Sequence, residues 1–142
     1  MAVYVIDPHA AIELARRGFS GSDDWELFAP TLLRSQVLAI LHTEIAAGAD
    51  SEEVFDLAER ACRLPRRLLG DAVLRRNAWA IATEQGWSEI YDAEYIALTR
   101  LHGLALIAGS DSLLEKAESL VQTETVDYLL NASGNWNRAH VL

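Results

Sequence analysis

A continuous apolar run, Leu-Ala-Leu-Ile-Ala over residues 104–108, constrains the fold more than any other feature of the sequence. A strand without alternating polar residues has both faces buried, as in a parallel sheet that helices cover on each side. A second strand-like run, Val3 to Ile6, opens the chain. Segments with helical spacing of apolar residues lie between and after these runs. The alternation predicts a three-layer α/β/α fold around a central, mostly parallel sheet.

Capping and turn residues divide the rest of the chain into expected elements. Helices are predicted over residues 10–17, 33–47, 51–64, 71–85, 88–102 and 113–120. A short helix is predicted around residues 25–27, because the preceding Ser and Asp residues are typical of an N-cap. Strands are predicted at residues 68–69 and, as a last outer strand, at residues 124–130.

Length and composition favour one small domain. The 142 residues are about half apolar, which is enough for a single core and predicts one domain over residues 1–130 with a polar C-terminal tail over residues 131–142. No apolar run approaches the roughly 20 residues that span a bilayer, and the N-terminus lacks the features of a signal peptide. The single cysteine, Cys62, excludes an internal disulfide and indicates a buried, inert thiol. We therefore expect a cytoplasmic protein without membrane association.

The net charge of −9 means that the chain does not attract nucleic acid through its overall field. An RNA substrate would need a local basic rim or a bound cation. Arginines between residues 60 and 76 offer such a rim, although local ion pairs with neighbouring acids are the more ordinary interpretation. Four tryptophans could stack on bases. Of these, Trp79 is expected in the core, Trp87 near the site or a dimer interface, and Trp136 in the tail, while Trp25 is left open.

Three aspartates follow or flank the predicted strands and helices in a suggestive way. Asp7 and Asp111 each come just after an apolar strand, and Asp92 lies in the first turn of a helix. In a parallel sheet the carboxyl ends of strands meet at one edge, so the three carboxylates can converge there. Hard oxygen ligands suit magnesium or manganese, which activate water in nucleases. Taken singly, each aspartate is more often a turn former or an N-cap, so the spacing alone indicates no more than a possible acidic site.

Four stretches resemble, in order, the motifs of PIN domains, and the third is most similar to VapC-type members. The resemblance covers about residues 3–130. The stretches are Val3 to Asp7, Phe28 to Leu38, Ile90 to Thr99 and Leu106 to Leu114.

The resemblance implies a magnesium- or manganese-dependent endoribonuclease, usually a homodimer. VapC-type members are toxins of toxin–antitoxin systems, inhibited by a small VapB antitoxin that occupies the active-site groove. By position, Asp7, Asp92 and Asp111 match three of the four family acids, so the resemblance implies that they are catalytic and hold the metal ion.

The sequence departs from the family pattern at three positions around this site. Gln36 stands where the family has Glu, and it can offer a neutral metal ligand or a hydrogen bond. His9 and Gly109 replace small hydroxyl residues, with Ser110 beside the latter, so His9 and Ser110 are expected on the rim. Glu44, two helical turns after Gln36, is expected to pack elsewhere, and Glu94 to lie on another helical face than Asp92. These departures motivate an alternative: a weakened or inactive PIN domain that binds RNA or a protein. A DNA nuclease of the same fold is a third possibility.

Overall fold

The computed structural model describes residues 1–132, and within them the chain forms a five-stranded sheet whose strands are all parallel. The strand order is β3-β2-β1-β4-β5. The strands are β1 (Ala2–Ile6), β2 (Trp25–Pro30), β3 (Arg67–Leu69), β4 (Ala105–Ile107) and β5 (Thr123–Glu124). Most of the predicted tail, with Trp136, lies outside the described residues.

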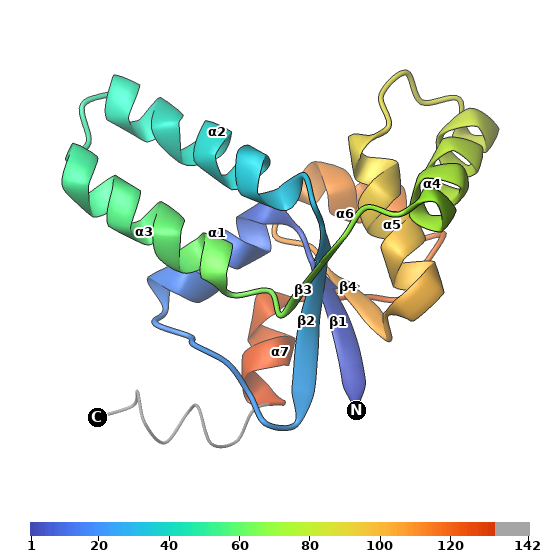
Figure 1. The fold of residues 1–142 in the computed structure, drawn as a ribbon, viewed down its shortest axis with the longest axis horizontal. Coiled ribbons are helices and arrows are strands. Elements are labelled where there is room, and N and C mark those ends of the chain that lie inside the picture. Colours follow the sequence, from blue (N-terminus) through green and yellow to red (C-terminus); the bar gives the residue numbers. More distant parts are fainter. Residues whose placement is uncertain (133–142) are drawn as a thin grey trace.

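Helices cover both faces of this sheet, which confirms the predicted three-layer α/β/α fold. In Figure 1, α1, α2, α3 and α7 lie on one side of the strands, and α4 and α5 lie on the other. The helices are α1 (Pro8–Arg16), α2 (Leu33–Ala46), α3 (Ser51–Arg63), α4 (Ala72–Gln85), α5 (Tyr91–His102), α6 (Asp111–Ala117) and α7 (Val126–Asn131). Within residues 1–132, none of these helices has the length and apolar character needed to cross a membrane.

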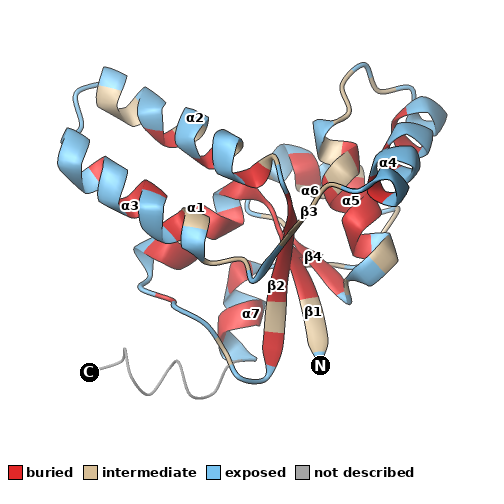
Figure 2. Ribbon diagram, in the orientation of Figure 1, coloured by how far each residue is buried: buried red, intermediate tan, exposed pale blue. Residues whose placement is uncertain are grey.

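Residues 4–6 of β1 and all of β4 are buried in the centre of the sheet. Val5 and Ile6 of β1 and Leu106 and Ile107 of β4 have no exposed surface, because helices pack on both faces of these strands (Figure 2). The predicted two-sided burial of the apolar run at residues 104–108 is therefore confirmed for Ala105–Ile107.

The sheet changes its direction of winding at β1. The chain passes from β1 to β2 on one side, whereas β4 pairs with the other edge of β1, with Ile6 opposite Ile107. In open α/β sheets such a switch point creates a crevice beyond the carboxyl ends of the two strands. Asp7 and the loop at residues 108–110 lie there, and the N–H of Asp7 extends the pairing by donating to the carbonyl of Ile107 at 3.2 Å.

The helix predicted around residues 25–27 is wrong, because this segment begins β2. Trp25 and Leu27 are buried whereas Glu26 between them is half-buried, which is the alternation of a strand. The polar residues that suggested an N-cap form a turn instead, in which the Ser22 hydroxyl accepts a hydrogen bond from the N–H of Asp24 at 3.1 Å.

The last predicted strand is wrong over most of its length. Only Thr123–Glu124 pairs with β4, and α7 follows immediately. The Thr125 side chain caps this helix by accepting a hydrogen bond from the N–H of Tyr128 at 3.0 Å. A threonine N-cap stabilises a helix start in competition with strand pairing.

The other predicted elements are present, with shifts of a few residues at their ends. The prediction that Trp79 lies in the core is wrong, because its side chain is 69 % exposed. The buried residues of α4 are Leu74, Ala78, Ile81 and Ala82, which recur at helical spacing and place Trp79 outside their stripe.

Candidate active site at the carboxyl ends of β1 and β4

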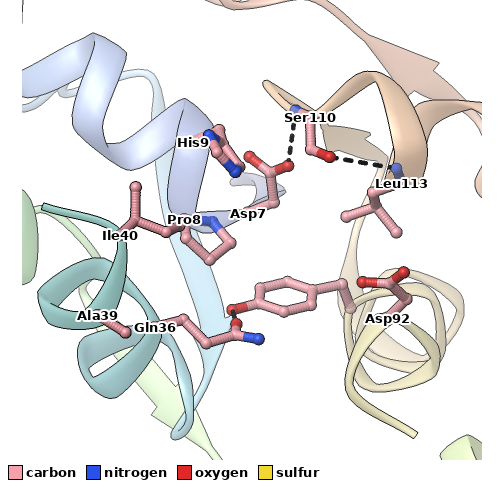
Figure 3. A pocket seen from close by; sticks show the side chains of 10 residues that line it. Asp7, Pro8, His9, Gln36, Ala39, Ile40, Asp92, Ser110 and Leu113 are labelled. Atoms are coloured by element: carbon pink, nitrogen blue, oxygen red, sulfur yellow. Dashed lines mark hydrogen bonds between the residues drawn. The ribbon is translucent and has the colours of Figure 1, made fainter. Parts of the chain in front are cut away.

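A cavity of about 220 Å³ lies beyond the carboxyl ends of the two central strands. It brings together three of the predicted metal ligands, Asp7, Gln36 and Asp92, from three separate parts of the fold (Figure 3). The lining residues are Asp7, Pro8, His9, Gln36, Ala39, Ile40, Asp92, Tyr95, Ser110 and Leu113.

Asp7 is completely buried and receives three backbone hydrogen bonds. Its Oδ1 accepts from the N–H groups of Ala10 at 2.7 Å and Gly109 at 2.9 Å, and its Oδ2 accepts from the N–H of Ser110 at 3.0 Å. Burial raises the pKa of the Asp7 carboxyl, while these N–H donors act in the opposite sense. Asp7 is thus both the N-cap of α1 and the residue that fastens the loop after β4 to that helix.

The loop after β4 approaches the start of α1 so closely that position 109 admits no side chain. A Cβ atom at Gly109 would lie 2.5 Å from the Ala10 nitrogen and 2.7 Å from the His9 carbonyl carbon. Both atoms belong to the backbone and have little freedom to move. The hydroxyl residue that the PIN-domain resemblance leads one to expect here therefore has no space in this chain.

Gln36 reaches the cavity from α2 and is held by Tyr95 of α5. The Tyr95 hydroxyl donates a hydrogen bond of 2.6 Å to Oε1 of Gln36. Burial and the negative charges of Asp7, Glu94 and Asp92 raise the pKa of Tyr95, so its hydroxyl stays protonated and remains a donor. Sequence reasoning missed Tyr95, although its position three residues after Asp92 places both side chains on one face of the helix.

Asp92 forms an ion pair with Lys116 of α6. The Lys116 Nζ lies 2.9 Å from Oδ2 of Asp92 and 3.4 Å from Oε1 of Glu89, and 5.0 Å from the centre of the Trp87 ring. Sequence reasoning missed Lys116 because this contact joins two helices 24 residues apart and no local spacing signals it. Trp87 does not line the cavity, and its predicted place near the site or a dimer interface stays a prediction.

Asp111 is exposed and does not line the cavity. It is the first residue of α6, and Ser110 takes the N-cap position, where its hydroxyl accepts a hydrogen bond from the N–H of Leu113 at 3.3 Å. Ser110 and the exposed His9 do line the cavity. The role of Asp111 as a ligand stays a prediction.

Neither of the other two acids considered from the sequence reaches the cavity. Glu44 forms an ion pair with Arg16 at 3.0 Å, as expected of a residue that packs elsewhere. Glu94 is half-buried outside the cavity lining, and burial raises the pKa of its carboxyl.

Two of the arginines proposed as a rim form ion pairs with acids of this chain, and of these two pairs that of Arg60 is the local kind which the more ordinary interpretation predicts. Arg60 pairs with Asp56 at 3.0 Å and donates to the carbonyl of Ala15 at 2.8 Å. Arg66 lies 3.6 Å from Glu26.

The donor set at the cavity has the chemistry for one hard divalent cation, held weakly. Asp7, Asp92 and Gln36 supply oxygen atoms, and Oδ2 of Asp7, with one hydrogen bond, keeps a free lone pair. Two features weaken the set: Gln36 carries no charge, and Lys116 neutralises Asp92. Within residues 1–132, no group of three or more His, Cys, Asp or Glu side chains is arranged to hold a metal ion.

Comparison with known proteins supports the fold. No family model and no curated protein matches the chain. Among solved structures, the crystal structure of PAE2754 from Pyrobaculum aerophilum is similar, with a TM-score of 0.71 and 23 % sequence identity over 93 % of this chain and 97 % of that one. At this identity the likeness shows a shared fold over nearly the whole of both chains.

Proposed function

We propose that this chain is a VapC-like PIN domain that hydrolyses RNA phosphodiester bonds with the help of magnesium or manganese. One observation carries the proposal: Asp7, Gln36 and Asp92 come from three different parts of the fold and share one cavity at the switch point of the sheet. Residues 90–99, which resemble the most distinctive motif of VapC-type members, supply both Asp92 and Tyr95 to it.

In this proposal Asp7 and Asp92 hold the cation and Gln36 adds a neutral oxygen. When bound, the cation supplies activation of water and neutralisation of charge on the phosphate. Tyr95 fixes the Gln36 side chain through the 2.6 Å hydrogen bond. His9 and Ser110 lie on the rim of the cavity, where an RNA backbone would pass. The exposed Asp111 beside Ser110 would act from the outer edge of the site.

Titration calorimetry with magnesium and manganese, followed by a cleavage assay on single-stranded RNA, tests this function. We expect Asp92→Asn to abolish specific metal binding and cleavage. Glu115→Gln is the matched control, because it removes one exposed acid from the neighbouring α6 outside the cavity. Metal-dependent cleavage that survives in Asp92→Asn would contradict the assignment. Cleavage of DNA in preference to RNA would indicate a DNA nuclease of the same fold.

A second candidate is a domain of this fold that binds RNA or a protein without cutting. The ion pair between Lys116 and Asp92 favours it, because a carboxylate that already has a cation partner is less available to a metal. The hydrogen bond from Tyr95 to Gln36 adds to this, since it occupies the neutral oxygen. Absence of binding at millimolar metal, together with retention of RNA by the intact protein, would support this candidate over the nuclease.

The partners remain part of the proposal. A homodimer and a VapB-like antitoxin are expected from the family resemblance, and we propose that the protein acts on RNA in the cytoplasm. Sedimentation equilibrium of the purified protein tests the dimer. Co-expression of this protein with the product of a small neighbouring reading frame, followed by copurification, tests whether an antitoxin binds it.

A further inference from the structure

Lys116 does not line the acidic cavity itself, but three side chains hold it beside Asp92, which does. Its ammonium lies 2.9 Å from Asp92, 3.4 Å from Glu89 and 5.0 Å from the centre of the Trp87 ring. About 30 % of the Lys116 side chain and 27 % of the Asp92 side chain are exposed, so the pair is partly shielded from solvent. Asp92 lines the cavity, and Lys116 thus neutralises one of the two carboxylates there.

We propose that Lys116 is a tethered competitor of the metal ion, which sets the cation affinity of the site by occupying Asp92. This inference rests on the proposed metal site. An ammonium group on Oδ2 of Asp92 and a divalent cation on the same carboxylate repel each other, so cation binding favours movement of Lys116 away from Asp92. The ion pair between Lys116 and Asp92 therefore lowers the affinity of the site for the cation.

Glu89 and Trp87 offer the Lys116 ammonium an alternative position away from Asp92. The lysine side chain has a flexible four-carbon stem, and its ammonium can turn from Asp92 toward Glu89 while it stays over the Trp87 ring. Glu89 already lies within ion-pair distance of Nζ. Glu89 should therefore help metal binding by taking over the ammonium, although it does not line the cavity itself.

Two variants test this idea in opposite directions. Lys116→Met keeps a side chain of similar length without charge, and we expect it to bind manganese about tenfold more tightly than the wild type in titration calorimetry. Glu89→Gln removes the alternative partner, and we expect manganese to bind a few-fold more weakly. Lys116→Arg keeps the charge and should stay near the wild-type affinity, and Glu115→Gln is the control for a lost exposed acid.

A spectroscopic readout follows the movement of Lys116 independently of affinity and activity. Magnesium should change the tryptophan emission of the wild type, because the ammonium shifts against the Trp87 ring. The change should be absent in Trp87→Phe and in Lys116→Met.

The possible results separate this inference from the proposed function. Equal manganese affinities in all variants would overturn the role of Lys116 and leave the metal site standing. No binding in the wild type or in Lys116→Met would overturn both. If Lys116→Met failed to fold, Lys116→Arg and Glu89→Gln would still decide, because a weaker Glu89→Gln site supports competition and an unchanged one contradicts it.

Discussion

The Tyr95 hydroxyl of α5 donates a 2.6 Å hydrogen bond to Oε1 of Gln36 in α2, 59 positions earlier in the sequence. Burial, together with the negative charges of Asp7, Glu94 and Asp92, raises the pKa of Tyr95, so its hydroxyl remains a donor. This bond orients the Gln36 amide, at the position where the PIN-domain resemblance leads one to expect a glutamate.

Removal of the Tyr95 hydroxyl should weaken the fold slightly. We expect Tyr95→Phe to lower the free energy of unfolding by about 1 kcal/mol, because Gln36 is only half-buried and water can replace the lost donor. Urea unfolding followed by circular dichroism measures this change. The control is Tyr91→Phe, an exposed tyrosine of the same helix, which should change stability by less than about 0.5 kcal/mol. Equal effects of the two variants would mean that the hydrogen bond contributes nothing.

A glutamate at position 36 should restore metal affinity to a dormant site. Gln36→Glu adds a third carboxylate to the cavity that Asp7 and Asp92 line, so we expect manganese to bind about tenfold more tightly. Without metal, repulsion among the three carboxylates should lower the melting temperature. Calorimetry and thermal unfolding with and without manganese measure both effects.

Ser35→Glu is the matched control for that substitution. It adds the same charge one residue earlier on α2, at an exposed position outside the cavity. An increase in affinity that is equal in the two variants would indicate a general charge effect. No increase in Gln36→Glu would favour the binding module over the nuclease.

The Cys62 thiol should react slowly in the native protein. It is half-buried, and burial raises its pKa, so little of it is the reactive thiolate at neutral pH. We expect a chromogenic disulfide reagent to modify the native protein at pH 7 at least about tenfold more slowly than the protein in denaturant. A native rate equal to that of the unfolded chain would contradict the interpretation of Cys62 as an inert thiol.

The fold was predictable wherever apolar residues form a continuous run or recur at a regular spacing in the sequence. Two-sided burial of Ala105–Ile107 follows from its uninterrupted apolar residues, and most helices follow from their spacing and caps. The errors fell where two local signals compete. At Trp25–Pro30 strand alternation competes with apparent helix-capping residues, and after Glu124 the helix cap at Thr125 prevails over strand-like composition.

Only those site residues could be predicted whose place follows from a single strand end or helix. Position predicted Asp7 and Asp92, which line the cavity, but it equally predicted Asp111, which does not, and Gln36 came from the family resemblance. Lys116 and the close approach at Gly109 depend on how α6 and its loop pack against α5 and α1. Contacts between elements far apart in the chain produce no regular spacing of residues, so neither feature could be inferred from the sequence.

Gly109 should tolerate no side chain, because its missing Cβ would lie 2.5 Å from the backbone nitrogen of Ala10. We expect Gly109→Ser, which introduces the residue type usual in PIN domains, to lower the free energy of unfolding by at least about 2 kcal/mol. The relief of this clash must move the loop after β4 away from α1. The hydrogen bonds from Gly109 and Ser110 to Asp7 should therefore weaken as well.

Gly70→Ala is the matched control for Gly109→Ser, since a Cβ there would meet the end of the exposed Thr31 side chain at 2.9 Å rather than backbone. Thr31 is exposed and can shift by a few tenths of an ångström, so we expect this variant to lose less than about 1 kcal/mol. Chemical denaturation of both variants measures the difference, and amide exchange at Gly109 and Ser110 reports whether their hydrogen bonds to Asp7 persist. If Gly109→Ser were as stable as the wild type, the loop after β4 would have room to move, and the absence of the usual hydroxyl residue would need a reason other than space.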